Sequence, residues 1–122
     1  MKARVTRDRR GRKTAVEPCA EPCPIERGMR ILGGKWTGSI LWHLKDEPVR
    51  FNDLSRLIGG ASKKMITERL RHLEAHELIE RQVLDTRPVG VAYRLTPHGR
   101  TALKCLDELR RWSERLEVDE AS

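Results

Sequence analysis

Three cysteines are the side chains in this sequence with the greatest capacity for covalent chemistry: Cys19, Cys23 and Cys105. An odd number of cysteines, with no apolar leader before them, argues against a structural disulfide framework. Pro24 suits the first turn of a helix, which makes Cys23 the residue preceding that helix. Unpaired N–H groups and the helix dipole favour a thiolate there. The spacing therefore predicts a reactive thiol at Cys23.

The neighbours of Cys23 leave two interpretations open. Arg27, one turn further on, would stabilise a thiolate, whereas Glu26 would oppose it. A thiolate would respond to oxidants or small electrophiles, with Cys19 either its resolving partner or without a role. Alternatively, Cys23 is only a small residue that caps the helix. We expect Cys105 to be buried filler in a core or a bond to a second chain.

Catalytic and metal-binding patterns are poorly represented. His72 and His76 lie one helical turn apart, but not in the His-Glu-x-x-His order of a zinc peptidase. Cys19 and Cys23 lack a second pair of ligands, so a zinc site is not expected. We find no glycine-rich phosphate loop, no Ser-His-Asp arrangement and no paired carboxylates. The sequence predicts neither an enzyme nor a cofactor or metal.

The positive charge is concentrated at the N-terminus. Of the net charge of +7 over 122 residues, residues 1–17 contribute +5, from seven basic and two acidic residues. Residues 1–22 are therefore predicted to be a basic tail too polar to fold alone and attracted to polyanions, or simply a disordered solubilising leader. No apolar run approaches a membrane span, so the expected location is the cytoplasm, without membrane association.

Apolar spacing predicts helices over residues 24–32, 36–44, 52–58 and 63–76. Gly59-Gly60 separates the last two, and Ser62 is suited to cap the final one. On that helix, Ile66, Leu70 and Leu73 form the buried stripe. A helix, a glycine turn and a second helix form the architecture of a helix-turn-helix.

Beyond residue 77 the apolar period changes to that of strands. Residues 78–84 and 91–95 are predicted to pair as a hairpin, joined by a turn at residues 85–88. Thr96-Pro97 then begins a last helix that runs to about Leu116. The predicted fold class is mainly α with a small β-hairpin, a winged helix-turn-helix. Its domain covers residues 23–117, and residues 118–122 form a short tail.

The last helix carries an apolar stripe at coiled-coil spacing. We expect it to pair with the first helix and their symmetry mates in a homodimer, and the alternative is a core helix within one chain. The residues predicted at the dimer interface are Ile25, Met29, Ala102, Cys105, Leu109, Trp112 and Leu116.

Several short segments follow one another in a characteristic order and spacing over residues 23–116. They are Cys23-Pro24-Ile25, Gly33-Gly34-Lys35-Trp36, Arg50-Phe51, Ser62 with Thr67 and Leu70-Arg71-His72-Leu73-Glu74, Tyr93-Arg94-Leu95-Thr96, Gly99 and Trp112. Together they resemble the HxlR family of winged helix-turn-helix transcriptional regulators. The resemblance implies a recognition helix at residues 62–75. It also implies that Cys23 could sense oxidants or electrophiles, as the matching cysteine does in several family members. The arginine-rich tail lies outside the family pattern.

A recognition helix contacts base edges in the DNA major groove with its first two turns. Projection of residues 62–75 at 100° per residue puts six residues on or near the exposed face: Ser62, Lys63, Lys64, Thr67, Glu68 and Arg71. Arg50 and Lys35 are predicted phosphate contacts, and Arg87 at the wing tip is predicted to reach either the minor groove or the backbone. Glu68 would accept from cytosine or pair with Arg71 or Lys64.

A dimer of such domains would bind double-stranded DNA at a pseudo-palindromic operator. The competing hypothesis is a protein-interaction module whose basic tail binds nucleic acid without sequence preference. The cationic start of the helix at residues 63–76 favours the first hypothesis.

Overall fold

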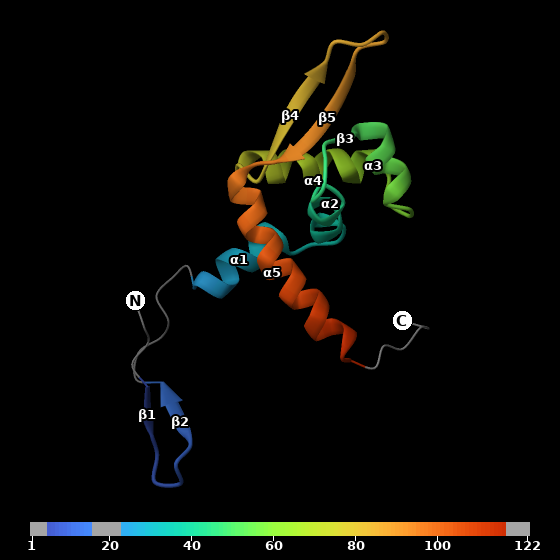
Figure 1. The fold of residues 1–122 in the computed structure, drawn as a ribbon. Coiled ribbons are helices and arrows are strands. Elements are labelled where there is room, and N and C mark those ends of the chain that lie inside the picture. The colour runs from blue at the N-terminus through green and yellow to red at the C-terminus, as the bar shows by residue number, and fades with distance from the viewer. Residues whose placement is uncertain (1–4, 16–22, 117–122) are drawn as a thin grey trace. The chain divides into compact units, whose positions relative to one another are not determined.

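The computed structural model describes residues 5–15 and 23–116 (Figure 1). The chain divides into two units, residues 1–30 and 31–122. In the first unit, β1 (Val5–Arg7) pairs antiparallel with β2 (Lys13–Ala15). The helix α1 (Pro24–Leu32) has the predicted bounds, and the N–H of Arg27 donates to the carbonyl of Cys23 at 2.8 Å.

The β1–β2 hairpin differs from the sequence expectation of a tail without regular structure. Its turn is held by local hydrogen bonds, in which the backbone N–H of Asp8 donates to the Arg12 carbonyl and that of Gly11 to the Asp8 carbonyl, each at 2.9 Å. Gly11 has a φ of +78°, a conformation that glycine adopts without strain. The turn of this hairpin is thus held by hydrogen bonds, in a segment whose residues are too polar to form an apolar core.

The second unit has a helical framework with a small sheet. It comprises α2 (Thr37–His43), β3 (Val49–Arg50), α3 (Phe51–Leu57), α4 (Lys63–Ala75), β4 (Ile79–Leu84), β5 (Gly90–Leu95) and α5 (Pro97–Glu114). The strand order is β3-β5-β4, all antiparallel. The predicted hairpin is confirmed, and the short strand β3 adds a third member that the sequence did not reveal.

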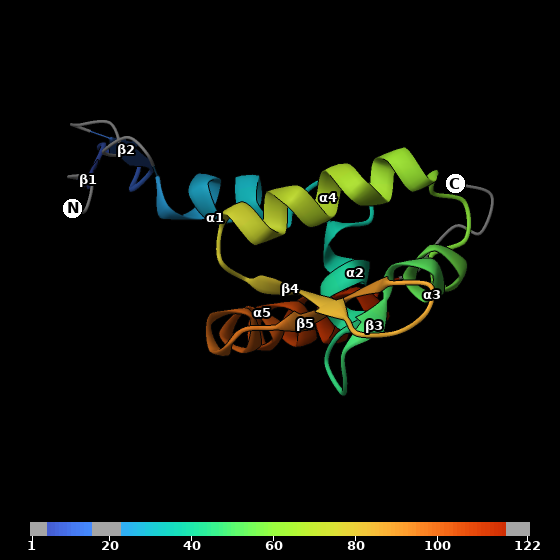
Figure 2. The same cartoon turned by 90° about the horizontal axis from the view of Figure 1, so that it is seen from above.

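The core gathers one apolar face from each helix of the second unit and the base of the wing. Ile66, Leu70 and Leu73 of α4 are all buried, as their spacing predicts. They meet Ile40 and Leu41 of α2, and the remaining buried members of the cluster are Leu44, Leu54, Ile58, Leu78, Ile79 and Leu95. This core holds α4 along one side of β4 and β5 (Figure 2), and the opposite face of the helix is exposed.

Both predicted helix caps of the second unit are present. The Ser62 hydroxyl accepts from the backbone N–H of Met65 at 3.1 Å, and that of Thr96 accepts from Gly99 at 2.9 Å. The Thr96 hydroxyl also donates to the Glu77 carbonyl at 2.6 Å. Each cap satisfies an end N–H of its helix, and Thr96 additionally fastens the start of α5 to the end of α4.

Some apolar residues of α5 pack against the core, and others are exposed. Ala102, Leu103 and Leu106 pack against the core of the same chain. Cys105 is exposed, contrary to the expectation of buried filler, because its side of the helix faces away from that core. Leu109, Trp112 and Leu116 are also exposed.

Candidate nucleic-acid interface

The first turns of α4 present a cationic surface. Lys63, Lys64, Glu68 and Arg71 are exposed together with Ser62, as the helical projection predicts. The α3–α4 turn contains Gly60 with a φ of +93°, so the chain reverses tightly before α4 begins. Within the described residues, no ion pair joins Glu68 to Arg71 or Lys64, which leaves all three charged groups available to a ligand.

Thr67 differs from its neighbours on α4. It is half-buried, and its hydroxyl donates to the Lys63 carbonyl one turn earlier at 2.8 Å. The hydroxyl proton is therefore engaged, and the remaining capacity of the oxygen is that of an acceptor. Contact with a base amino group fits this arrangement better than donation to a phosphate.

The flank of α4 is attached to the end of α1 and to the connection between α1 and α2. Arg69 donates from Nε to the Lys35 carbonyl at 3.0 Å, and His72 Nε2 lies 3.0 Å from the Ile31 carbonyl. A carbonyl can only accept, so Nε2 carries the proton in that contact. His76 lies edge-on to His72, with ring centroids 4.8 Å apart. These side chains position the helix instead of forming a metal site.

Lys35 extends over an aromatic ring. Its ammonium lies 4.9 Å from the ring centroid of Trp36, which is within cation–π distance. Trp36 itself has a φ of 76° and packs beside Gly60, where an added Cβ would meet the indole at 3.5 Å. The predicted phosphate contact at Lys35 is thus exposed and held near the turn of the helix-turn-helix.

A groove between α3, α4 and the wing brings together three residues that the sequence predicts as DNA contacts: Arg50, Thr67 and Arg87. It has a volume of 760 Å³. Figure 1 shows the β4–β5 connection at the far end of the wing. Arg56 also lines this groove, and its Nη2 lies 3.4 Å from Oδ1 of Asp53. We call the set Arg50, Arg56 and Arg87 the three-arginine groove.

Arg56 was missed at the sequence level. It lies on the short helix α3, whose polar face offers no distinctive spacing, and only the folded wing brings it close to Arg87. An arginine on the exposed face of the first helix of a helix-turn-helix was the available signal, since that helix crosses the DNA backbone.

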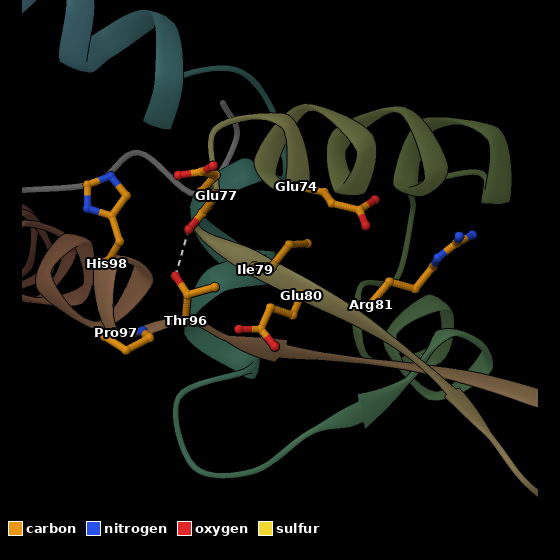
Figure 3. Close-up of a pocket in the computed structure, with 8 residues that line it drawn as sticks. All are labelled: Glu74, Glu77, Ile79, Glu80, Arg81, Thr96, Pro97 and His98. Atoms are coloured by element: carbon orange, nitrogen blue, oxygen red, sulfur yellow. Dashed lines mark hydrogen bonds between the residues drawn. The ribbon is translucent and has the colours of Figure 1, made fainter.

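The opposite end of α4 is acidic. A pocket of 650 Å³ there is lined by Glu74 of α4, Glu77 after it, and Glu80 and Arg81 of β4, with His98 of α5 (Figure 3). Glu80 is paired with Arg94 at 2.9 Å, so the carboxylates of Glu74 and Glu77 are the ones that would repel DNA phosphates at this end, whereas the lysines would attract them at the other. A polyanion approaching α4 would therefore be attracted to its first turns rather than to its last.

The described cysteines are both free thiols. Cys23 is half-buried and directly precedes α1, and Cys105 is exposed. Cys19 lies outside the described residues. Within residues 5–15 and 23–116, no helix is long and apolar enough to cross a membrane, and no three histidine, cysteine or carboxylate side chains cluster as metal ligands.

A helix-turn-helix core, an antiparallel wing and a cationic exposed helix define a winged helix-turn-helix protein, which confirms the predicted fold class. Residues 31–120 match the model of the family described as HxlR-like helix-turn-helix. The chain therefore belongs to the HxlR family. It is a transcriptional regulator of helix-turn-helix type rather than an enzyme, as its relatives are.

Relatives support this membership in sequence and in structure. The HTH-type transcriptional regulator YodB of Bacillus subtilis is 39% identical over 95 residues, covering 77% of this chain and 85% of YodB. The crystal structure of a Porphyromonas gingivalis W83 protein, assigned by its description to the MarR family of transcriptional regulators, matches with a TM-score of 0.76 and 32% identity, over 83% and 99% of the two chains. The redox regulator HypR in its oxidized form matches with a TM-score of 0.75 and 34% identity, over 80% and 100%.

Proposed function

We propose that this chain is a sequence-specific regulator that binds double-stranded DNA as a homodimer on a pseudo-palindromic operator. The observation that carries the proposal is the cationic, solvent-exposed start of α4 beside the three-arginine groove. The α4 residues Lys63, Lys64 and Arg71 donate to base edges or adjacent phosphates, and Glu68 accepts from a cytosine amino group. The three arginines and Lys35 hold the sugar–phosphate backbone on either side.

The homodimer is proposed from two exposed apolar surfaces. On α1, Ile25 and Met29 are 73% and 61% exposed, and on α5 Leu109 and Trp112 are 55% and 57% exposed. Side chains of this size are costly to leave in water, and coverage by a second copy removes that cost. Leu116 and Cys105 extend the α5 surface, whereas half-buried Ala102 contributes mainly to its own core.

A change of Leu109 to Asp tests this assembly. Sedimentation equilibrium should report a dimer for the wild type and a monomer for the variant. A matched change of Glu108 to Asp, on the same exposed turn, should leave the dimer intact. A wild-type protein that sediments as a monomer at micromolar concentration would overturn the proposed interface.

Control by thiol chemistry is proposed for Cys23. The relatives include a redox regulator, HypR, and YodB, whose structure has been determined in a reduced form. Cys23 is a free thiol in a half-buried residue just before α1, so the residue is not enclosed in the core. Cys19 or Cys105 would act as the second thiol. The protein would work in a prokaryotic cytoplasm, with its folded domain at residues 23–117.

Selection of bound fragments from a random duplex library tests sequence specificity directly. Purified wild-type protein under reducing conditions should enrich a two-fold-symmetric sequence. Its half-sites should lie about 34 Å apart, one turn of DNA, or a multiple of that spacing. Enrichment of no sequence would overturn the proposal.

A second candidate is a protein-interaction module that binds nucleic acid only through its tail. The observation that favours it is the location of +5 of the net charge in residues 1–17. Deletion of these residues separates the two functions. Sequence-specific binding should survive the deletion if α4 carries it, and DNA binding should largely disappear if the tail does.

A further inference from the structure

The β1–β2 hairpin presents an ordered cationic tip. Its strands pair in register from Val5–Ala15 to Arg7–Lys13, which leaves residues 8–12 as the connection. Five basic residues and a single carboxylate, that of Asp8, occupy residues 7–13. All five cations are exposed: Arg7, Arg9, Arg10, Arg12 and Lys13.

Asp8 organises this tip from within. Its Oδ1 accepts from the backbone N–H groups of Arg10 and Arg12, both at 2.9 Å, and its Oδ2 accepts from Arg12 Nε at 2.8 Å. Arg7 closes the far side by donating from Nη1 to the Gly11 carbonyl at 2.8 Å. The hydrogen bonds from the Arg12 backbone and side chain hold the pKa of Asp8 below its ordinary value of 3.8. The carboxylate is therefore ionised and engaged inside the turn at neutral pH.

The cations of the tip fall into two groups. The side chains of Arg7 and Arg12 donate hydrogen bonds within the turn. The side chains of Arg9, Arg10 and Lys13 make no hydrogen bond or ion pair within the described residues. A hairpin that fixes its backbone before binding loses less conformational entropy than a flexible basic tail would. The tip thus has the properties of a preformed anion-binding element.

We propose that the tip of the β1–β2 hairpin binds the sugar–phosphate backbone of duplex DNA, without sequence preference, as a contact separate from α4 and the wing. The hairpin lies outside residues 31–120, which match the family model. The choice of duplex DNA rests on the proposed function, since a domain bound to an operator raises the local concentration of DNA phosphates around its own tail. Neutralised phosphates release counterions, which makes such a contact salt-dependent.

A change of Asp8 to Ala in the full chain gives a test in which charge and structure act in opposite directions. The variant gains positive charge, so attraction by charge alone predicts tighter binding. Loss of the turn hydrogen bonds predicts weaker binding if the ordered tip is what contacts DNA. The matched control is Asp46→Ala, which adds the same charge at an exposed loop between α2 and β3.

The measurement is fluorescence anisotropy with a 20-base-pair duplex of scrambled sequence over a range of salt concentrations. We expect Asp8→Ala to bind several-fold more weakly than Asp46→Ala, with a shallower dependence of log K on log salt. The double variant Arg9→Gln/Arg10→Gln keeps the Asp8 turn and should lower the slope by about 1.8, because each lost phosphate contact removes about 0.9. Equal or tighter binding by Asp8→Ala would overturn the proposal.

Two further arms separate this proposal from the proposed function. If library selection yields an operator while Asp8→Ala loses nothing on the scrambled duplex, the hairpin contact fails and the regulator stands. If no operator is selected but Asp8→Ala still binds the scrambled duplex weakly, the hairpin contact stands alone. Binding of the wild type to phosphatidylserine vesicles, lost in Asp8→Ala, with no effect of that change on duplex binding, would also overturn the proposal.

Discussion

Arg69, on the recognition helix α4, donates a hydrogen bond from Nε to the backbone carbonyl of Lys35, 3.0 Å away in the connection between α1 and α2. Gly34 lies beside it, where an added Cβ would be 3.5 Å from the guanidinium carbon. One turn further along α4, His72 holds the Ile31 carbonyl. Two polar side chains therefore attach the helix proposed to contact bases to one segment of the preceding chain.

We expect a change of Arg69 to Met to lower specific DNA affinity without removing a phosphate contact. The methionine keeps the aliphatic packing but loses the hydrogen bond to Lys35, which should reduce the free energy of unfolding by about 1 kcal/mol. Urea denaturation measures that loss, and anisotropy on the selected operator measures affinity. The salt slope should match that of the wild type. A slope lowered by about 0.9 would show instead that Arg69 contacts a phosphate.

The loss of DNA affinity should depend on DNA sequence for a variant of Arg71 but not for a variant of Arg56. Arg71→Ala removes a donor to a base edge, so operator affinity should fall by about 1–3 kcal/mol while binding to scrambled duplex changes little. Arg56→Ala removes a phosphate contact in the three-arginine groove. It should weaken binding to both sequences equally and lower the salt slope by about 0.9. Equal losses on both duplexes for Arg71→Ala would exclude its role in base recognition.

Gly99 is expected to tolerate no side chain. It is buried at the start of α5, and a Cβ there would overlap the Leu78 carbonyl, which already accepts from the Thr96 N–H at 3.1 Å. Gly99→Ala must move α5 away from Leu78, at a cost of about 1–3 kcal/mol in the free energy of unfolding. Gly59→Ala is the matched control, because nothing lies within 4 Å of its added Cβ. Similar urea midpoints for the two variants would contradict this account.

Thr37 is fully buried in α2, and within the described residues its hydroxyl has no hydrogen-bond partner. Thr37→Val replaces the hydroxyl with a methyl of similar size and removes a desolvation cost, so stability should stay equal or rise by up to about 1 kcal/mol. Thr37→Ser keeps the hydroxyl and deletes the buried methyl, so it should lose about 1 kcal/mol. Thermal denaturation of the two variants provides the comparison. A valine variant less stable than the serine variant would show that the hydroxyl has a partner, such as a buried water.

The features predicted correctly from sequence depend on residues close together in the chain. The helix α4 was predicted because Ile66, Leu70 and Leu73 recur at helical spacing, and Ser62 caps it through Met65, three residues on. The start of α5 was predicted in the same way, because Thr96 is suited to cap a helix and Pro97 to occupy its first turn. In such segments, local preference and tertiary packing favour the same structure.

The features that were missed depend on distant partners. The strand β3 has two residues, and it exists because Val49 and Arg50 pair with β5 more than forty positions later. The contact of Arg69 with Lys35 spans 34 positions. Arg56 joined the candidate site only through the folded wing. No periodicity within a short window reports such pairings, so the sequence predicted the recognition helix but not the side chains that position it.

Cys23→Ser should abolish any response of operator binding to peroxide while leaving affinity under reducing conditions unchanged. Peroxide transfers an oxygen to a thiolate to give a sulfenic acid, which condenses with a second thiol to form a disulfide and release water. Serine has the same shape just before α1 but cannot undergo either step. In the wild type we expect peroxide to change operator affinity by about tenfold, equivalent to about 1.4 kcal/mol. The response of Cys105→Ser reports whether the exposed thiol on α5 is the second partner. If Cys23→Ser responds to peroxide as the wild type does, Cys23 is a structural residue at the start of α1.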